Sequence, residues 1–181
     1  MQPPRTASPL ARAAAVVIVG MLALGACSSD EASPAAGKQG DTVAALLASG
    51  MAAQGKGDAE TAAAAYKGVL ATDPTNKYAL YNLGTIDQLA GRAAEAEPKY
   101  RAALASDPNF EPALFNLAIV RTTSAPQEAA DLYEKVIALD PERAGAHFNL
   151  GVVQRSLGRA AEADRSFARA RELDPTLKPP T

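Results

Sequence analysis

The order of large apolar, small and polar residues repeats along most of the chain. Three stretches open with similar segments, LYNLG at 80–84, LFNLA at 114–118 and HFNLG at 147–151. In each stretch a Glu-Ala pair follows, and an aromatic residue stands four positions after the alanine: Tyr100, Tyr133 and Phe167. Apolar residues three or four positions apart mark one face of a helix. The pattern therefore predicts repeated helices with an apolar face.

Asp-Pro steps mark where these stretches end, and successive prolines lie 34, 33 and 34 residues apart, at Pro74, Pro108, Pro141 and Pro175. Proline cannot continue a helix and disfavours the helical conformation of the residue before it. A second break lies about halfway through three stretches, at Gly57, Gly91 and Gly158. Each stretch is thus predicted to be a helix–turn–helix hairpin.

This pattern resembles the tetratricopeptide repeat, in which a large residue, Leu-Gly, Ala, an aromatic, Ala and Pro recur at fixed offsets. The matching residues of the second stretch are Leu80, Leu83, Gly84, Ala96, Tyr100, Ala103 and Pro108. Those of the fourth are His147, Leu150, Gly151, Ala163, Phe167, Ala170 and Pro175. The first stretch opens less typically, with Leu46 and Gly50, but keeps Ala62, Tyr66 and Pro74.

The resemblance implies an all-α fold, a solenoid of four hairpins with about eight helices in a right-handed superhelical stack. It covers residues 43–177, with repeats at about 43–76, 77–110, 111–143 and 144–177, and leaves a tail at 178–181. Arg171 stands where the earlier repeats have Leu70, Leu104 and Ile137. A polar residue there suits a terminal repeat, so we expect the stack to end with the fourth hairpin.

Composition agrees with helices and excludes several functional classes. Alanine, the best helix former, supplies much of the 48% hydrophobic content. Lys and Arg number 18 against 20 Asp and Glu, which gives no basic field for nucleic acid. One Cys and one His, His147, exclude a disulfide framework and a His/Cys metal cluster, and we expect His147 to be a partly buried packing residue. No catalytic constellation or phosphate loop is visible, so we expect neither an enzyme nor a cofactor.

The N-terminal residues have the features of an export signal. Arg5 and Arg12 precede an apolar run at 13–24, which is too short to span a membrane comfortably. The run ends in LGAC, which resembles the bacterial lipoprotein signal. The resemblance implies cleavage after residue 26 and a diacylglyceryl thioether on Cys27, which would hold the protein in the cell envelope on the outer face of the cytoplasmic membrane, or on an outer membrane. An uncleaved anchor and a plain secreted protein are the alternatives.

Four structural expectations follow from these patterns. Residues 27–41, rich in Ser, Gly, Pro and charge, should be a disordered tether. Small residues Gly84, Ala118 and Gly151 should face Ala96, Ala129 and Ala163 across each hairpin, with the aromatic residues in the seams between hairpins. Pro98 should bend its helix or delay its start. Asp87 and Arg121, at one position of adjacent repeats, should form an ion pair.

Tetratricopeptide stacks present a groove lined by their first helices, so the family pattern also implies a binding site. It assigns to the groove Tyr78, Tyr81, Asn82, Thr85, Gln88, Phe115, Asn116, Ile119, Phe148, Asn149, Val152 and Arg155. Aromatic and amide side chains suit an extended peptide, and the three Asn residues are expected to form a ladder along its backbone. We therefore expect a protein or peptide partner. Self-assembly through the uncapped last hairpin is the alternative, and packing within the repeat is the alternative role for the Asn residues.

Overall fold

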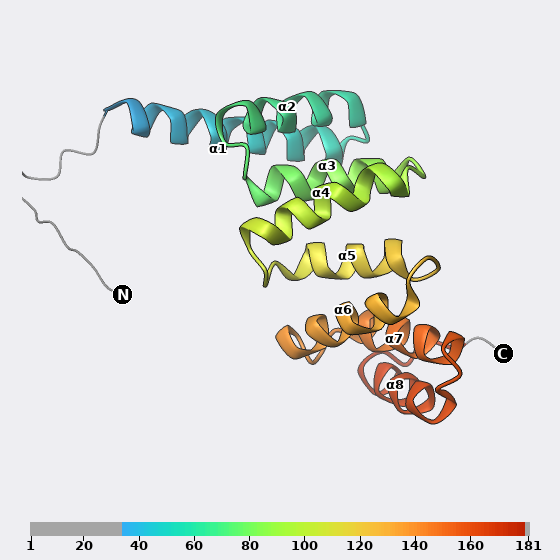
Figure 1. The fold of residues 1–181 in the computed structure, drawn as a ribbon. Helices are drawn as coiled ribbons and strands as arrows, with labels where there is room; N and C mark the ends of the chain where they lie inside the picture. Colours follow the sequence, from blue (N-terminus) through green and yellow to red (C-terminus); the bar gives the residue numbers. More distant parts are fainter. Residues whose placement is uncertain (1–33, 180–181) are drawn as a thin grey trace, which may run out of the picture. The chain divides into compact units, whose positions relative to one another are not determined.

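The computed structural model describes residues 34–179, and within this range the chain forms eight α-helices and no strand (Figure 1). The first helices of the four hairpins are α1 (Pro34–Gly55), α3 (Lys77–Leu89), α5 (Glu111–Arg121) and α7 (Ala144–Ser156). The second helices are α2 (Ala59–Thr72), α4 (Ala93–Ser106), α6 (Pro126–Leu139) and α8 (Ala160–Leu173). Each hairpin packs on the next, so the all-α repeat fold expected from the sequence is confirmed.

The Asp-Pro steps end the second helices as expected. Each aspartate donates its backbone N–H to the carbonyl four residues earlier, at 2.8–3.0 Å, and the helix stops there: Asp73, Asp107, Asp140 and Asp174. The turns inside hairpins one, two and four contain Gly57, Gly91 and Gly158 with φ of 75–77°, a conformation that favours glycine. The third turn, 122–125, has four residues where the other three have three each, and it contains no glycine.

Helix α1 begins earlier than the sequence indicated. The expectation of a disordered tether as far as residue 41 is wrong for residues 34–41, which are helical. Proline is tolerated in the first turn of a helix, where its missing N–H would have no partner, so Pro34 can begin α1 rather than block it. Residues 38–42 of this extension are exposed and are continuous with the packed part of α1. The signal at 1–26, Cys27 and the rest of the tether lie outside the described residues.

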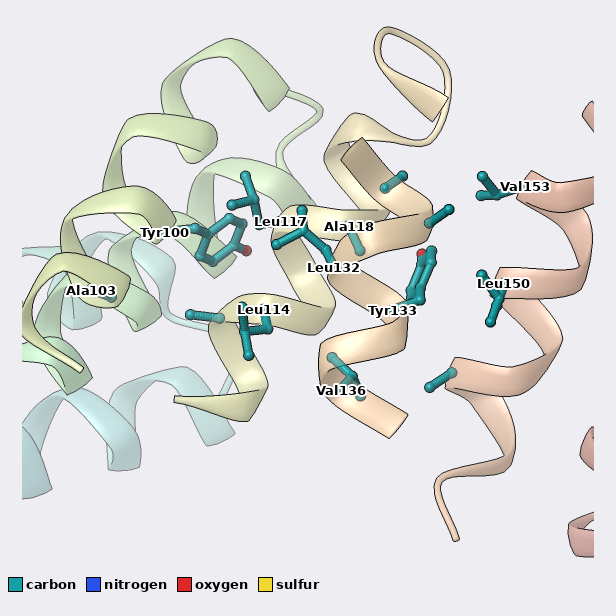
Figure 2. Packing of buried hydrophobic residues seen from close by; sticks show 14 of the residues in the cluster. Tyr100, Ala103, Leu114, Leu117, Ala118, Leu132, Tyr133, Val136, Leu150 and Val153 are labelled. Carbon is teal, nitrogen blue, oxygen red and sulfur yellow. The ribbon is translucent and has the colours of Figure 1, made fainter. Parts of the chain in front are cut away.

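The aromatic residues form the core, as predicted. Tyr66, Tyr100, Tyr133 and Phe167 are at most 2% exposed, and Figure 2 shows Tyr100 and Tyr133 among the aliphatic residues of α5, α6 and α7. The same rings also explain why glycine stands opposite three of them, at Gly50, Gly84 and Gly151. A Cβ placed on Gly84 would lie 2.7–3.2 Å from the Tyr100 ring. The nearest obstacle to a side chain at Gly84 is therefore an aromatic ring of the same hairpin, and the expected close approach of Gly84 to Ala96 stays a prediction.

Pro98 lies inside an uninterrupted helix. Because α4 starts at Ala93, five residues before the proline, the expected late start is wrong. Pro98 and the residue four positions earlier, Ala94, are both exposed. Water can therefore bond the Ala94 carbonyl that the proline leaves without its helical donor.

Candidate functional site

The residues assigned to the groove lie on the first helices α3, α5 and α7, and we call this surface the first-helix face. Tyr78 is 50% exposed and Ile119 is 38% exposed. Arg155 is also exposed, and the other assigned side chains are half-buried: Tyr81, Asn82, Thr85, Gln88, Phe115, Asn116, Phe148, Asn149 and Val152. The structure thus leaves every one of these residues accessible to a partner in part.

An aromatic cluster occupies the end of this face on the second hairpin. Phe110 meets Tyr78 and Tyr81 edge to face, with ring centroids 5.5 Å apart in both pairs. The Lys77 ammonium lies 5.1 Å from the Tyr78 and Phe110 centroids and forms an ion pair with Asp107. These contacts hold Tyr78 in one orientation while half of it remains exposed.

The buried tyrosines of the first two hairpins each donate a hydrogen bond to a glutamine of their own first helix. The Tyr66 hydroxyl donates to Gln54 Oε1 at 2.9 Å, and the Tyr100 hydroxyl donates to Gln88 Oε1 at 2.6 Å. In the third hairpin, Thr122 takes the glutamine position and lies within hydrogen-bonding reach of Tyr133. Gln88 and Thr122 therefore lie at the hydroxyl ends of buried tyrosine rings.

The Asn residues have a structural role in addition to any role in binding. Asn116 Nδ2 donates to the Tyr100 hydroxyl of the preceding hairpin at 3.3 Å, and Asn149 stands in the same relation to Tyr133, within reach of its hydroxyl. Burial raises the pKa of both tyrosines, so their hydroxyls stay protonated. Asn116 thus helps to join successive hairpins, and the ladder along a bound backbone stays a prediction.

The fourth hairpin replaces the hydrogen bond with an aromatic contact. Phe167 has no hydroxyl, and Arg155 stands where the first two hairpins have glutamine. The Arg155 guanidinium carbon lies 4.8 Å from the Phe167 ring centroid, and Phe148 packs on the same ring with centroids 5.5 Å apart. The two residue differences are therefore complementary, because Arg155 contacts the Phe167 ring where the first two hairpins have a hydrogen bond between glutamine and tyrosine.

A hollow of about 370 Å³ opens on the first-helix face between the third and fourth hairpins. Three of the assigned groove residues line it, together with two threonines and a core tyrosine: Ile119, Thr122, Thr123, Tyr133, Asn149 and Val152. The Thr122 hydroxyl donates to the Ala118 carbonyl at 2.9 Å, within its own helix. The sequence analysis did not find this hollow, although threonine at a glutamine position is visible as a departure from the repeat.

The sequence analysis also missed a charged pair beside this face. Arg143 Nη1 lies 2.7 Å from Glu111 and donates to its carboxylate, and the guanidinium carbon lies 4.0 Å from the Phe115 ring centroid. Burial raises the pKa of Glu111 although Arg143 opposes this shift. His147, as expected, is half-buried, and its Nε2 contacts the Pro141 carbonyl at 3.0 Å.

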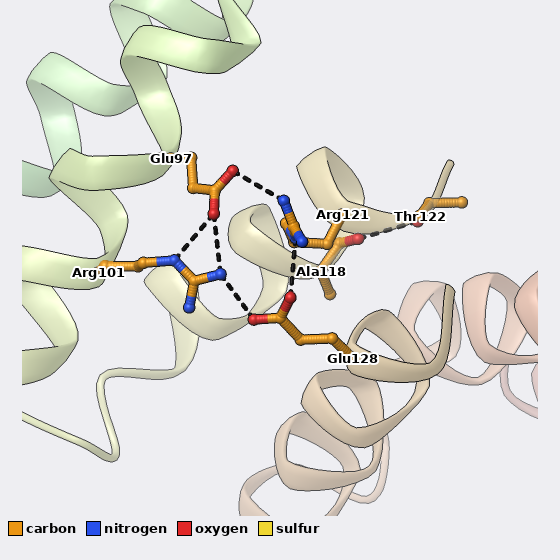
Figure 3. Close-up of polar contacts among 6 residues, drawn as sticks. All are labelled: Glu97, Arg101, Ala118, Arg121, Thr122 and Glu128. Carbon is orange, nitrogen blue, oxygen red and sulfur yellow. Dashed lines mark hydrogen bonds and ion pairs between the residues drawn. The ribbon is translucent and has the colours of Figure 1, made fainter. Parts of the chain in front are cut away.

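A ring of alternating charges joins the second and third hairpins (Figure 3). Arg101 Nη2 lies 2.8 Å from Glu97 and 2.7 Å from Glu128, and Arg121 lies 3.1 Å and 2.8 Å from the same two carboxylates. The expected pair of Asp87 with Arg121 is wrong, because Asp87 pairs with Arg92 at 2.7 Å and Lys99 at 2.6 Å. Helix α5 packs on the second helices α6 and α4 much more than on α3, so Arg121 meets carboxylates of second helices instead.

Over residues 34–179, no three His, Cys, Asp or Glu side chains are grouped so that they could hold a metal ion. In the same range we find no helix with the length and apolar character needed to cross a membrane.

Comparison with solved structures shows the same fold elsewhere. A MamA protein is 28% identical, covers 75% of this chain and 75% of its own, and superposes with a TM-score of 0.68. PilF of Pseudomonas aeruginosa is 24% identical over 77% of this chain and 64% of its own, with a TM-score of 0.68. YrrB, described as a TPR protein with an unusual peptide-binding site, is 22% identical over 74% and 69%, with a TM-score of 0.64.

No curated protein matches the sequence. The family model for the tetratricopeptide repeat matches residues 47–120 and 123–177, which is well over half of the chain. The chain therefore belongs to the tetratricopeptide repeat family.

Proposed function

We propose that this protein is an adaptor that holds an extended segment of another protein on its first-helix face. The tetratricopeptide fold supports a role in protein–protein interaction or as a scaffold, and proteins built from these repeats are in general not enzymes. The partly exposed aromatic residues of three consecutive first helices are the observation that carries the proposal.

Their exposure is informative because the aromatic residues of the second helices are buried. Tyr100 and Tyr133 are at most 1% exposed, whereas Tyr78 keeps half of its surface in water and Tyr81, Phe115 and Phe148 are half-buried. A large apolar side chain gains free energy when a partner covers it. Aromatic residues are also enriched among those that dominate binding energy at interfaces.

The second part of the proposal concerns location. LGAC after a short apolar run supports a lipid on Cys27, which would place the adaptor on the outer face of a membrane of the cell envelope. The helical extension of α1 at residues 34–41 lies between that cysteine and the repeats. A partner would then be an exported or membrane-bound protein of the same compartment.

The test is site-specific photo-cross-linking in intact cells. A photoreactive amino acid replaces Tyr78 or Ile119 on the first-helix face, and Glu134, exposed on the second helix α6, serves as the matched control position. We expect positions 78 and 119 to join one common protein that position 134 does not join. Equal products from all three positions, or none from 78 and 119, would contradict the proposal.

A further inference from the structure

We propose that the exposed part of α1 at residues 38–42 is a site of proteolytic release, where a protease that cuts after lysine hydrolyses the peptide bond between Lys38 and Gln39. Water adds to the Lys38 carbonyl carbon and the C–N bond breaks, which leaves a carboxylate on Lys38 and an amine on Gln39. The cut separates the repeats from the lipid on Cys27. Because that lipid is part of the proposed function, the release rests on it.

Residues 38–42 of α1 lie outside the hydrophobic core. All five are exposed, and a Cβ added to Gly40 would have no atom within 4 Å. Over residues 38–55, Val43 is the first that packs against the core of the first hairpin. The Thr42 hydroxyl donates to the Lys38 carbonyl at 2.9 Å, within the segment itself. The segment is therefore held mainly by the hydrogen bonds of its own helix.

Its sequence makes this end of α1 easy to open. Gly37 and Gly40 stand inside the helix, and each glycine shifts the local equilibrium away from the helix about fivefold relative to alanine. The first turn of α1 contains no acidic side chain that would stabilise its free N–H groups. A folded helix must open locally before a protease can cut it. The rate of cutting then follows the population of the open form.

The position of the lysine determines what a cut would do. Lys38 is the one Lys or Arg between Cys27 and Val43. A cut after it removes none of the residues that pack against the core of the first hairpin. The first-helix face begins at Tyr78, so a released chain keeps that face complete.

The next basic residue, Lys56, is a poorer site although it is also exposed. It lies in the turn between α1 and α2, where the backbone N–H groups of residues 56–58 donate to carbonyls of α1 at 3.0 Å. A cut there would also divide the first hairpin. We therefore expect a protease to prefer Lys38.

Limited digestion of the full chain in detergent with trypsin, which cuts after lysine and arginine, tests this preference. Mass spectrometry should find the bond after Lys38 cut first, and the fragment that starts at Gln39 should persist. The double variant Gly37→Ala/Gly40→Ala should slow this cut roughly tenfold or more, because local opening becomes rarer. Gly55→Ala, at the other end of α1 and also with nothing within 4 Å of the new Cβ, is the matched control and should leave the rate unchanged.

Two results of the digestion would overturn the inference. One is a first cut at Lys56 or within the repeats. The other is an unchanged rate in the Gly37→Ala/Gly40→Ala variant, which would mean that opening of this segment does not limit the cut.

In cells, release predicts two forms of the protein. Mass spectrometry should find the lipid-bearing chain in the membrane fraction and a fragment that starts at Gln39 in the soluble fraction. Lys38→Gln should abolish the fragment, whereas Lys67→Gln, at an exposed residue of α2, should not. The absence of this fragment, or equal amounts of it from Lys38→Gln and wild type, would contradict release.

These outcomes can be told apart from a failure of the proposed function. If no fragment forms but positions 78 and 119 still cross-link a partner, the adaptor proposal stands and release is wrong. If Cys27 carries no lipid, the proposed anchoring and the release are both wrong, wherever trypsin cuts.

Discussion

The Nδ2 amide of Asn116 donates to the hydroxyl of Tyr100 at 3.3 Å, and this bond joins a residue of the first-helix face to the core of the preceding hairpin. The hydroxyl in turn donates to Gln88 at 2.6 Å. A side chain assigned to partner binding thus also holds two repeats together. Binding and stability are therefore linked at Asn116.

Asn116→Ala should lower the free energy of unfolding by about 0.5–1.5 kcal/mol, since it removes one hydrogen bond while Tyr100 keeps its bond to Gln88. Urea unfolding measures this. Asn109→Ala, at an exposed loop residue, is the control and should change little. Equal stability of Asn116→Ala and wild type would mean that the bond contributes nothing, and the ladder would then concern binding alone.

Gly84→Ala should also destabilise the second hairpin. Its Cβ would lie 2.7–3.2 Å from atoms of the buried Tyr100 ring, and overpacking of this kind costs about 1–3 kcal/mol. Gly55→Ala, at the end of α1 with nothing within 4 Å of the new Cβ, is the matched control. The third hairpin has Ala118 at the equivalent position. A neutral result for Gly84→Ala would show that the Tyr100 ring can shift to accept a methyl group.

The repeat itself could be predicted from the sequence because its signals are local. Proline and aspartate end helices wherever they stand, and aromatic residues at helical spacing need a core. Side-chain contacts between hairpins could not be predicted this way. Asp87 and Arg121 share a repeat position, but α5 packs on α6 and α4 much more than on α3, so Arg121 meets Glu97 and Glu128 instead.

The site shows the same division between what the sequence reveals and what it does not. The family pattern placed the twelve assigned residues on accessible parts of the first helices, because the hairpin repeat fixes the side of each helix. The hollow was missed, since it depends on how far one side chain reaches: Thr122 bonds its own helix where Gln88 reaches the tyrosine. Arg143 and Glu111 are 32 residues apart in sequence, and their contact cannot be predicted from the spacing of the repeats.

Acid should weaken the charge ring through Glu128. Hydrogen bonds from Arg101 and Arg121 hold the pKa of this carboxyl below its ordinary value of 4.5. As the pH falls, the unfolded chain therefore takes up the Glu128 proton before the folded chain does. The contribution of Glu128 to stability is thus present above about pH 4.5 and is lost as the pH falls through the folded-state pKa. Glu128→Gln should lower stability at pH 6.5 by less than about 1 kcal/mol per partly exposed pair, and the difference from wild type should shrink toward pH 3. Urea unfolding of both proteins between pH 6.5 and pH 3 measures this difference. Glu134→Gln, at an exposed residue of α6, is the control.

Lipidation predicts a mature chain that starts at Cys27 and stays in the membrane fraction. Cys27 is the chain's one cysteine, so no other thiol can take the lipid. Mass spectrometry of the membrane fraction should find a diacylglyceryl group there and no residues from 1–26. Cys27→Ser should abolish both the modification and the cleavage. A serine variant that is cut at the same bond and retained equally well would leave the protein secreted or anchored by other means.

Double-mutant cycles should find coupling where the structure places ion pairs and none where only the repeat spacing suggested it. Arg121 Nη1 lies 3.1 Å from Glu97, and both side chains are about a quarter exposed, so the pair should couple by about 0.2–1 kcal/mol. Burial raises the pKa of Asp87, but hydrogen bonds from Lys99 and Arg92 outweigh this effect and keep it below the ordinary value, so Asp87 is charged and already paired. The cycle of Asp87→Ala with Arg121→Ala should therefore be additive within error. Coupling in that cycle and none between Arg121 and Glu97 would mean that the hairpins stack in a different register in solution.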